Sequence, residues 1–252
     1  MANSRFGIPV ALFLILSSCS IIKENRDSCP CSLQVEISGL MDTPATLLVK
    51  SMRDSSYVEL LSISRDTLMT LYVPRGGVTL SAWAGASAPG EAVLIPSGSE
   101  APPLYLYYGK VDAGGDLAYA DIRLHKQFCT LTLEVEGPPG WGPPIGTAVR
   151  GCAGGMSLTG GIVPGNFSCS PSGLPTTVRL PRQHPDSQLM LDIMMQDNIV
   201  RTFSLGAYLQ KAGYSWTSID LADITVHMDL SVTAVTFTTP EQSESITMTV
   251  DI

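Results

Sequence analysis

Strict alternation of apolar and polar residues is the strongest pattern along the chain, and it occurs in four segments. These are residues 33–37, 131–136, 224–230 and 246–252. Because successive side chains of a strand point to opposite faces, each segment predicts a β-strand with one face on a core and the other toward solvent. Weaker strand patterns occupy residues 47–52, 68–73, 78–83, 104–108, 119–124, 189–194 and 199–205.

Turn signals rich in Gly and Pro separate these strands, for example at residues 75–77, 113–116 and 137–140. A spacing of roughly 8 to 12 residues between turns is typical of a β-sandwich or barrel. One short helix is predicted over residues 205–213, because Leu205 and Leu209 lie four apart and a glycine stands where a C-terminal cap belongs. Strands do not alternate with helices, which argues against an α/β nucleotide-binding architecture.

The pattern predicts an all-β fold of two β-sandwich domains in series, with one short helix in the second domain. A polar break at residues 125–127 interrupts two strand patterns and marks the boundary. The N-terminal sandwich is then expected over residues 33–125 and the C-terminal sandwich over residues 126–252. Residues 137–188 are rich in Gly and Pro and are expected to form long loops or an insertion in the second domain.

The N-terminus has the features of a secreted protein. Residues 1–18 carry one positive charge at Arg5 and an apolar run followed by small residues, which is typical of a signal peptide. The run ends in Leu-Ser-Ser-Cys19, which resembles a bacterial lipobox and predicts a lipidated Cys19 after cleavage. A plain signal peptide cut elsewhere, or a short membrane anchor, remains the alternative. Residues 19–32 are then a polar tether.

Composition narrows the function classes. The chain of 252 residues has a formal charge of −8, with 15% charged and 44% hydrophobic residues. An acidic chain lacks the clustered Lys and Arg that bind phosphate backbones, so nucleic acid is excluded as a partner. The sequence contains no G-x-S-x-G elbow, P-loop, H-E-x-x-H or dinucleotide motif, so we expect neither an enzyme nor a cofactor.

Histidines and paired carboxylates were the first candidates for chemistry. His125, His184 and His227 are scattered, which favours surface residues over a metal site. Asp220 and Asp223 are close enough in sequence for a calcium or glycosidase site, but no run of ligand-spaced residues accompanies them. We therefore expect these two carboxylates to accept backbone N–H groups in the turn before a strand.

Aromatic residues allow two interpretations. Tyr105, Tyr107 and Tyr108 lie together in sequence, with Trp83 upstream and Trp141 in a Gly-Pro loop. Such side chains could form a stacking platform for sugars. A strand that packs one face on a core gives the same alternation, and this is the favoured interpretation.

Cysteines in an oxidising compartment suggest disulfides. With Cys19 taken by lipid, an odd number remains, so at least one thiol stays unpaired within the monomer. A bridge between Cys152 and Cys169 would close a flexible stretch, and Cys129 could pair with Cys29 or Cys31, although sequence cannot give the connectivity.

Three segments together resemble the Bacteroidales-type fimbrial anchor family, the lipoprotein subunits of type V pili. They are the lipobox ending at residues 17–19, the Arg-Asp-Ser-Cys-Pro segment at 26–30, and residues 213–226 with their Gly…Trp…Asp-Leu-x-Asp-Ile-x-Val pattern. The resemblance implies two transthyretin-like β-sandwiches, a lipid on Cys19, and a position at the base of a fimbrium on the outer membrane. It also implies pilin subunits as partners, joined by strand exchange.

A lipid on Cys19 adds a constraint, because the first strand at residues 33–37 must then stay joined to the body. The connection to the fibre is therefore expected at the C-terminal end, where the alternating residues are Ile246, Met248, Val250 and Ile252. The alternative is that this segment is simply the last strand of the second sandwich. A second functional hypothesis is a surface lipoprotein whose sandwich binds glycans or proteins as an adhesin.

Overall fold

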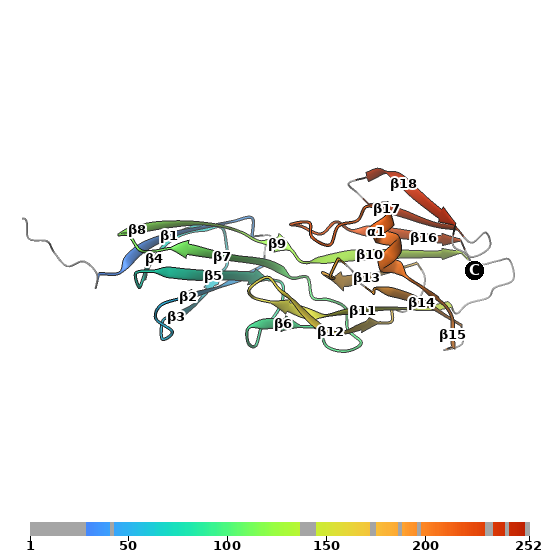
Figure 1. Ribbon diagram of the computed structural model, residues 1–252, viewed down its shortest axis with the longest axis horizontal. Helices are drawn as coiled ribbons and strands as arrows, with labels where there is room; N and C mark the ends of the chain where they lie inside the picture. Colours follow the sequence, from blue (N-terminus) through green and yellow to red (C-terminus); the bar gives the residue numbers. More distant parts are fainter. Residues whose placement is uncertain are drawn as a thin grey trace, which may run out of the picture.

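The computed structural model describes residues 29–40, 43–136, 145–171, 175–185, 188–195, 198–229, 234–239 and 242–249. These residues form an elongated molecule of packed β-sheets with one short helix (Figure 1). The predicted all-β fold is confirmed. We refer to residues 29–126 as the N-terminal half and to residues 128–249 as the C-terminal half.

The N-terminal half contains two sheets. One has the order β4-β1-β8 and the other the order β3-β2-β5-β7-β9. The strands are β1 (Cys31–Ser38), β2 (Ala45–Ser51), β3 (Val58–Ile63), β4 (Thr67–Val73), β5 (Gly77–Ala84), β6 (Ala92–Leu94), β7 (Tyr105–Asp112), β8 (Leu117–Arg123) and β9 (His125–Lys126).

The C-terminal half also contains two sheets, with the orders β13-β10-β16-β17-β18 and β12-β11-β14-β15. Its elements are β10 (Phe128–Glu136), β11 (Ile145–Ser157), β12 (Ile162–Cys169), β13 (Thr176–Pro181), β14 (Met190–Met195), β15 (Asn198–Phe203), α1 (Leu205–Lys211), β16 (Ile224–Asp229), β17 (Ala234–Thr239) and β18 (Gln242–Thr249).

The two halves repeat one topology that the sequence does not reveal. Strand β1 pairs antiparallel with β4 and parallel with β8, and β10 pairs in the same way with β13 and β16. The order β3-β2-β5-β7 corresponds to β12-β11-β14-β15. The hairpin of β17 and β18 extends the C-terminal half beyond β16, whereas β8, the equivalent of β16, is the last strand of its sheet within the described residues.

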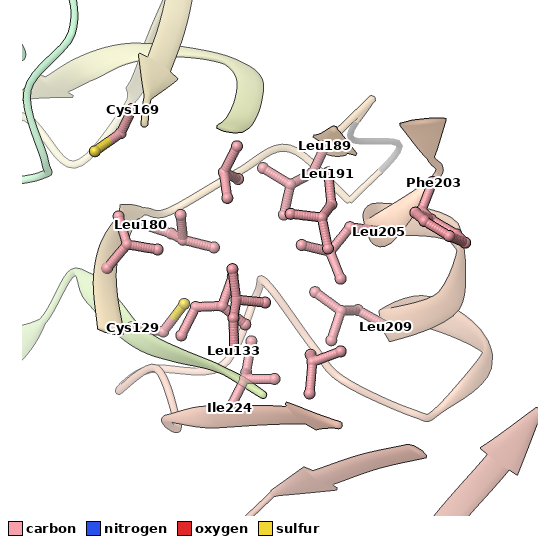
Figure 2. Close-up of a cluster of buried hydrophobic side chains, with 14 of the residues drawn as sticks. Cys129, Leu133, Cys169, Leu180, Leu189, Leu191, Phe203, Leu205, Leu209 and Ile224 are labelled. Carbon is pink, nitrogen blue, oxygen red and sulfur yellow. The ribbon is translucent and has the colours of Figure 1, made fainter. Parts of the chain in front are cut away.

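Each half encloses its own hydrophobic core. In the N-terminal half the core includes Leu33, Val35, Leu47 and Leu80, all fully buried. In the C-terminal half, leucines from β10, β13 and β14 meet the helix α1, and Figure 2 shows Leu205 and Leu209 of that helix pointing into the cluster. In three of the four alternating segments, which begin at residues 33, 131 and 224, the predicted inward side chains are buried or half-buried.

The helix confirms the sequence prediction closely. It covers residues 205–211, with Ala212 at the C-cap and Gly213 following at a φ of 79°. A positive φ is easily adopted only by glycine, so this residue ends the helix and turns the chain toward β16.

The prediction of long loops over residues 137–188 was wrong for most of that range. Residues 145–169 form a two-stranded hairpin of β11 and β12, and residues 176–181 form β13. The N-terminal half also contributes β6, which pairs with β11 at Gly155, Met156 and Ser157. A third hydrophobic cluster covers this junction and contains Trp83, Val93, Leu104, Leu106, Met156 and Leu158.

Candidate assembly site

The C-terminal strand was the predicted site of contact with a pilin. Ile246 and Met248 lie in β18, opposite Phe237 and Val235 of β17. Val250 and Ile252 lie outside the described residues. Strand β18 is the outermost strand of its sheet, paired on one side only within the described residues. The segment is therefore part of the second sandwich and also forms one of its edges, a position at which another strand can add.

The first strand fills its own sheet. Strand β1 lies between β4 and β8, with pairing on both sides along nearly its whole length. Its inward side chains, Cys31, Leu33, Val35 and Ile37, are at most 1% exposed. Removing this strand would open a groove through the N-terminal core, so in the intact chain that groove is occupied by the chain itself.

The predicted lipid site, Cys19, and the signal peptide lie outside the described residues. The first described residues are held in place by Arg75, whose Nε donates to the Cys29 carbonyl at 2.9 Å. Another nitrogen of the same guanidinium donates to the Gly114 carbonyl, and a third is ion-paired with Asp116. This arginine fixes the point at which the chain enters the N-terminal half.

Asp220 and Asp223 do accept backbone N–H groups, but the donors are distant in sequence. The N–H of Lys126 donates to Asp220 and the N–H of Thr130 donates to Asp223, each at 2.6 Å. Lys126 Nζ also lies 2.6 Å from Asp223 Oδ1. The expectation of local hydrogen bonds within the turn was wrong, because both carboxylates clamp the segment that joins the two halves.

Arg182 completes this clamp and was not found from the sequence. Its guanidinium donates to the carbonyls of Trp216, Ser218 and Ile219, and to the side chain of Gln127. It lies at the end of β13, immediately before a loop, and no motif marked it. Segment 213–226 is thereby held against the junction between the two halves.

The pKa values of the clamp carboxylates agree with this role. Burial alone would raise the pKa of Asp220 and of Asp223, yet the hydrogen bonds that each receives bring both values below the usual range. Both groups therefore remain ionised at neutral pH. His125 adds a contact to Asp220 at 3.1 Å.

The remaining two histidines both belong to the C-terminal half. His184 is exposed, and His227 lies 3.5 Å from Glu134. Among the described residues, no group of His, Cys, Asp and Glu is placed to hold a metal ion. The same residues contain no helix that is long and apolar enough to cross a membrane.

The five described cysteines are free thiols. Cys169 lies opposite Val149 in the β11–β12 ladder, whereas Cys152 lies three positions further along β11. At about 3.3 Å per residue, this offset exceeds the roughly 7 Å across which a disulfide can reach. Cys31 and Cys129 are buried in the cores of opposite halves, and burial raises the pKa of Cys129 to about 12.

Among the described residues, Trp83, Tyr105 and Tyr107 pack against the cores and do not form an exposed platform. Tyr105 and Tyr107 pack against the N-terminal core, and Tyr105 makes an edge-to-face contact with Phe128. Trp83 is 6% exposed, in the junction cluster. Trp141 lies outside the described residues. Tyr108 lines a groove of about 440 Å³ at the junction, together with Tyr107, His125 and residues of the loop at 217–219.

Comparison with solved structures places this architecture in one structural class. The chain has the fold of bacterial proteins described as a candidate polysaccharide-binding protein, a candidate adhesin and a fimbrial anchor protein. No family model matches the sequence, and no curated protein matches it either. The likeness therefore lies in the fold.

Three structures represent this class. A candidate polysaccharide-binding protein from Bacteroides thetaiotaomicron superposes with a TM-score of 0.64 at 12% identity, covering 88% of this chain and 98% of the other. A candidate adhesin from Bacteroides ovatus gives 0.58 at 11% identity, covering 86% and 95%. The fimbrial anchor protein Mfa2 from Porphyromonas gingivalis gives 0.55 at 10% identity, covering 79% and 91%.

Proposed function

We propose that this chain is a lipid-anchored fimbrial subunit that attaches a fibre to the outer membrane and terminates its assembly. The observation that carries the proposal is the placement of the two ends. The chain enters β1 at one end of the long axis, and β18 runs to the opposite end (Figure 1). A lipid on Cys19 would hold the first end at the membrane and leave the other free for a pilin.

The occupied first sheet supports the terminating role. In strand exchange, a subunit can accept a neighbour's strand only where its own strand has left a groove. Here β1 is buried between two neighbours, and Cys19 precedes it by 12 positions in the sequence. A chain held by its lipid keeps β1 in place, so growth of the fibre stops at this subunit.

The contact with the fibre is proposed at the edge formed by β18. Because β18 is already paired with β17, a pilin would add beside it or replace it in the sheet. Either arrangement uses backbone hydrogen bonds for affinity and alternate side chains for register. The fold shared with the fimbrial anchor protein Mfa2 supports this choice of partner.

Deletion of residues 246–252 tests the proposal. The truncated protein should remain in the membrane fraction but no longer co-purify with fimbriae, because the edge strand is shortened and its attachment point is lost. The matched variant, Cys19→Ala, should leave the membrane fraction but still co-purify with fimbriae. If the truncated protein still co-purifies at the wild-type level, the C-terminal edge is not the contact.

An adhesin is the second candidate, and the neighbours described as adhesin and polysaccharide-binding proteins favour it. Since Tyr105 and Tyr107 pack on the core, glycan contacts would fall to exposed rings such as Tyr119, which is 66% exposed, or to Trp141. Glycan-array binding that is lost in Tyr119→Ala or Trp141→Ala would support this function. Normal fimbrial attachment in a strain lacking the protein would support it further.

A further inference from the structure

At one end of the N-terminal half, the first described residues lie beside three tight turns. We call this end the tip, and it comprises residues 29–30, 52–57, 74–76 and 113–116. Hydrogen bonds tie the turns together, since Met52 N–H donates to the Gly77 carbonyl and Ala113 N–H donates to the Gly76 carbonyl. Arg75 joins residues 29 and 114 to the same assembly.

Large apolar side chains surround the tip and are exposed. Met52 is 58% exposed, Val58 55%, Tyr72 69% and Leu117 46%. Tyr72 and Leu117 lie on either side of Ser32 in the three-stranded sheet, and Val58 begins the strand that follows the 52–57 turn. Exposed apolar side chains also occur along the sheets, at Leu60, Leu68 and Tyr119, but these four surround the point where the chain enters and make this end a candidate interaction surface.

A polar groove of about 960 Å³ opens at the tip, and of the exposed apolar residues Tyr72 lines it. Arg53 lines it and has no ion-pair partner among the described residues, whereas Arg75 is occupied by two carbonyls and Asp116. The nearby carboxylates are satisfied locally, since Asp54 accepts from Ser56 and Asp112 accepts from Gly114 N–H. The tip is thus apolar at its rim, and Arg53 carries the guanidinium that has no ion-pair partner among the described residues.

The chain outside the structure indicates what covers this surface. Residues 20–28 lead from the tip directly to Cys19, so a lipid at Cys19 would bring the tip to within one short segment of the bilayer. Apolar side chains, tyrosine rings and an arginine that can reach a phosphate are the groups that suit the boundary between headgroups and acyl chains.

We propose that the tip docks on the membrane, with the side chains of Met52, Val58, Tyr72 and Leu117 at the headgroup boundary and Arg53 bound to lipid phosphate. The docked tip would hold the long axis away from the bilayer, whereas a tether alone would let the molecule tumble. The inference rests on the lipid anchor of the proposed function. It adds a second contact that places the far end, with β18, outward.

Hydrogen exchange on the mature lipoprotein tests the docking. The protein is reconstituted on vesicles of phosphatidylethanolamine and phosphatidylglycerol, at about three to one, and compared with the Cys19→Ala protein free in solution. The turns at 52–57 and 113–116 should exchange at least about five-fold more slowly on vesicles. The exposed turn at 159–161, at the junction, should not change. Because most of the docking side chains are apolar, protection should persist at about 0.5 M salt.

The double variant Met52→Glu/Leu117→Glu should stay on the vesicles through its lipid but lose the protection of the tip. Leu94→Glu is the matched control, because Leu94 is 59% exposed on β6 at the junction. Circular dichroism checks that the variants are folded. Wild-type protein that binds vesicles without protection of the tip would overturn the docking alone. Wild-type protein that does not bind vesicles at all would overturn the lipid anchor and the docking together.

Discussion

Asp223 contacts residues of both halves at the junction. Its carboxylate accepts the Thr130 N–H and pairs with Lys126 Nζ. Replacement by alanine leaves a partly buried N–H without its acceptor, so Asp223→Ala should lower the free energy of unfolding by about 1–3 kcal/mol in urea titrations. Asp121→Ala is the control, because Asp121 is exposed and its ion-pair partner, Arg123, is exposed as well. A control that loses as much as Asp223→Ala would contradict the clamp.

Asp192 carries the clearest dependence of stability on pH. Its side chain is 2% exposed and accepts two hydrogen bonds from Arg150 and one from Thr202. The bonds from Arg150 are the main reason that the pKa of Asp192 lies below its usual value. A lowered folded-state pKa means that the carboxylate stabilises the fold above its unfolded pKa of about 3.9, and that this contribution disappears as pH falls through the folded-state pKa.

The variant Asp192→Asn should therefore be less stable than the wild type by about 1.5–3 kcal/mol at neutral pH, because the bonds to the charged group are lost. As the pH falls below about 3.9, the difference should shrink. Urea denaturation at a series of pH values measures this difference in the free energy of unfolding. A difference that stays constant into the acid range would show that the charge of Asp192 is not what stabilises the fold.

At the scale of the elements, β11 depends on close contact between backbones. A Cβ added to Gly155 would lie 2.2 Å from the Val93 carbonyl oxygen of β6, and one added to Gly154 would lie 2.9 Å from Gly165 Cα of β12. Gly155→Ala should therefore separate β6 from β11 and destabilise the protein by about 1–3 kcal/mol. Hydrogen exchange at residues 92–94 should rise.

Gly161 provides the matched control for this prediction. An added Cβ there meets nothing within 4 Å, so Gly161→Ala should leave both stability and exchange at β6 unchanged. If Gly155→Ala and Gly161→Ala have the same stability and the same exchange at β6, the pairing of β6 with β11 contributes little to the stability of the protein.

These same glycines explain why β11 could not be predicted from the sequence. Strands such as β1 and β16 alternate strictly because one face is buried and the other is wet, and the sequence located both to within two residues. Strand β11 contains four glycines, and at two of them, Gly154 and Gly155, another backbone passes too close for a side chain. The pattern of side chains that marks a strand is therefore missing. Strand β11 is rich in glycine, as loops are, because two of its glycines leave room for the backbones of β6 and β12.

The clamp could be predicted only in part, for a different reason. The type of bond at Asp220 and Asp223 followed from the chemistry of a carboxylate before a strand. Its partners lie more than 90 positions away, because the parallel pairing of β10 with β16 brings residues 126–130 beside residues 220–224. Local patterns carry no information on such a pairing, and Arg182 was missed for the same reason.

The whole molecule is expected to behave as one rigid rod. Besides the clamp, β6 of the N-terminal half pairs with β11, and the junction cluster buries side chains from both halves around Trp83. A fibre subunit held at one end and loaded at the other transmits force across this junction, so a stiff junction suits the proposed role. Three separate kinds of contact join the two halves, which distinguishes this arrangement from domains on a flexible linker.

Cooperative unfolding is the consequence that calorimetry can measure. The wild type should unfold in a single transition whose calorimetric and van't Hoff enthalpies agree, since neither half loses structure without exposing the junction cluster. Trp83→Ala removes the largest side chain of that cluster and should cost about 3–5 kcal/mol. Because the loss falls on the junction, the variant should unfold in two transitions, whereas Tyr119→Ala, on an exposed face, should keep one. Two transitions in the wild type would contradict the rigid rod and would require the membrane end and the fibre end to move independently.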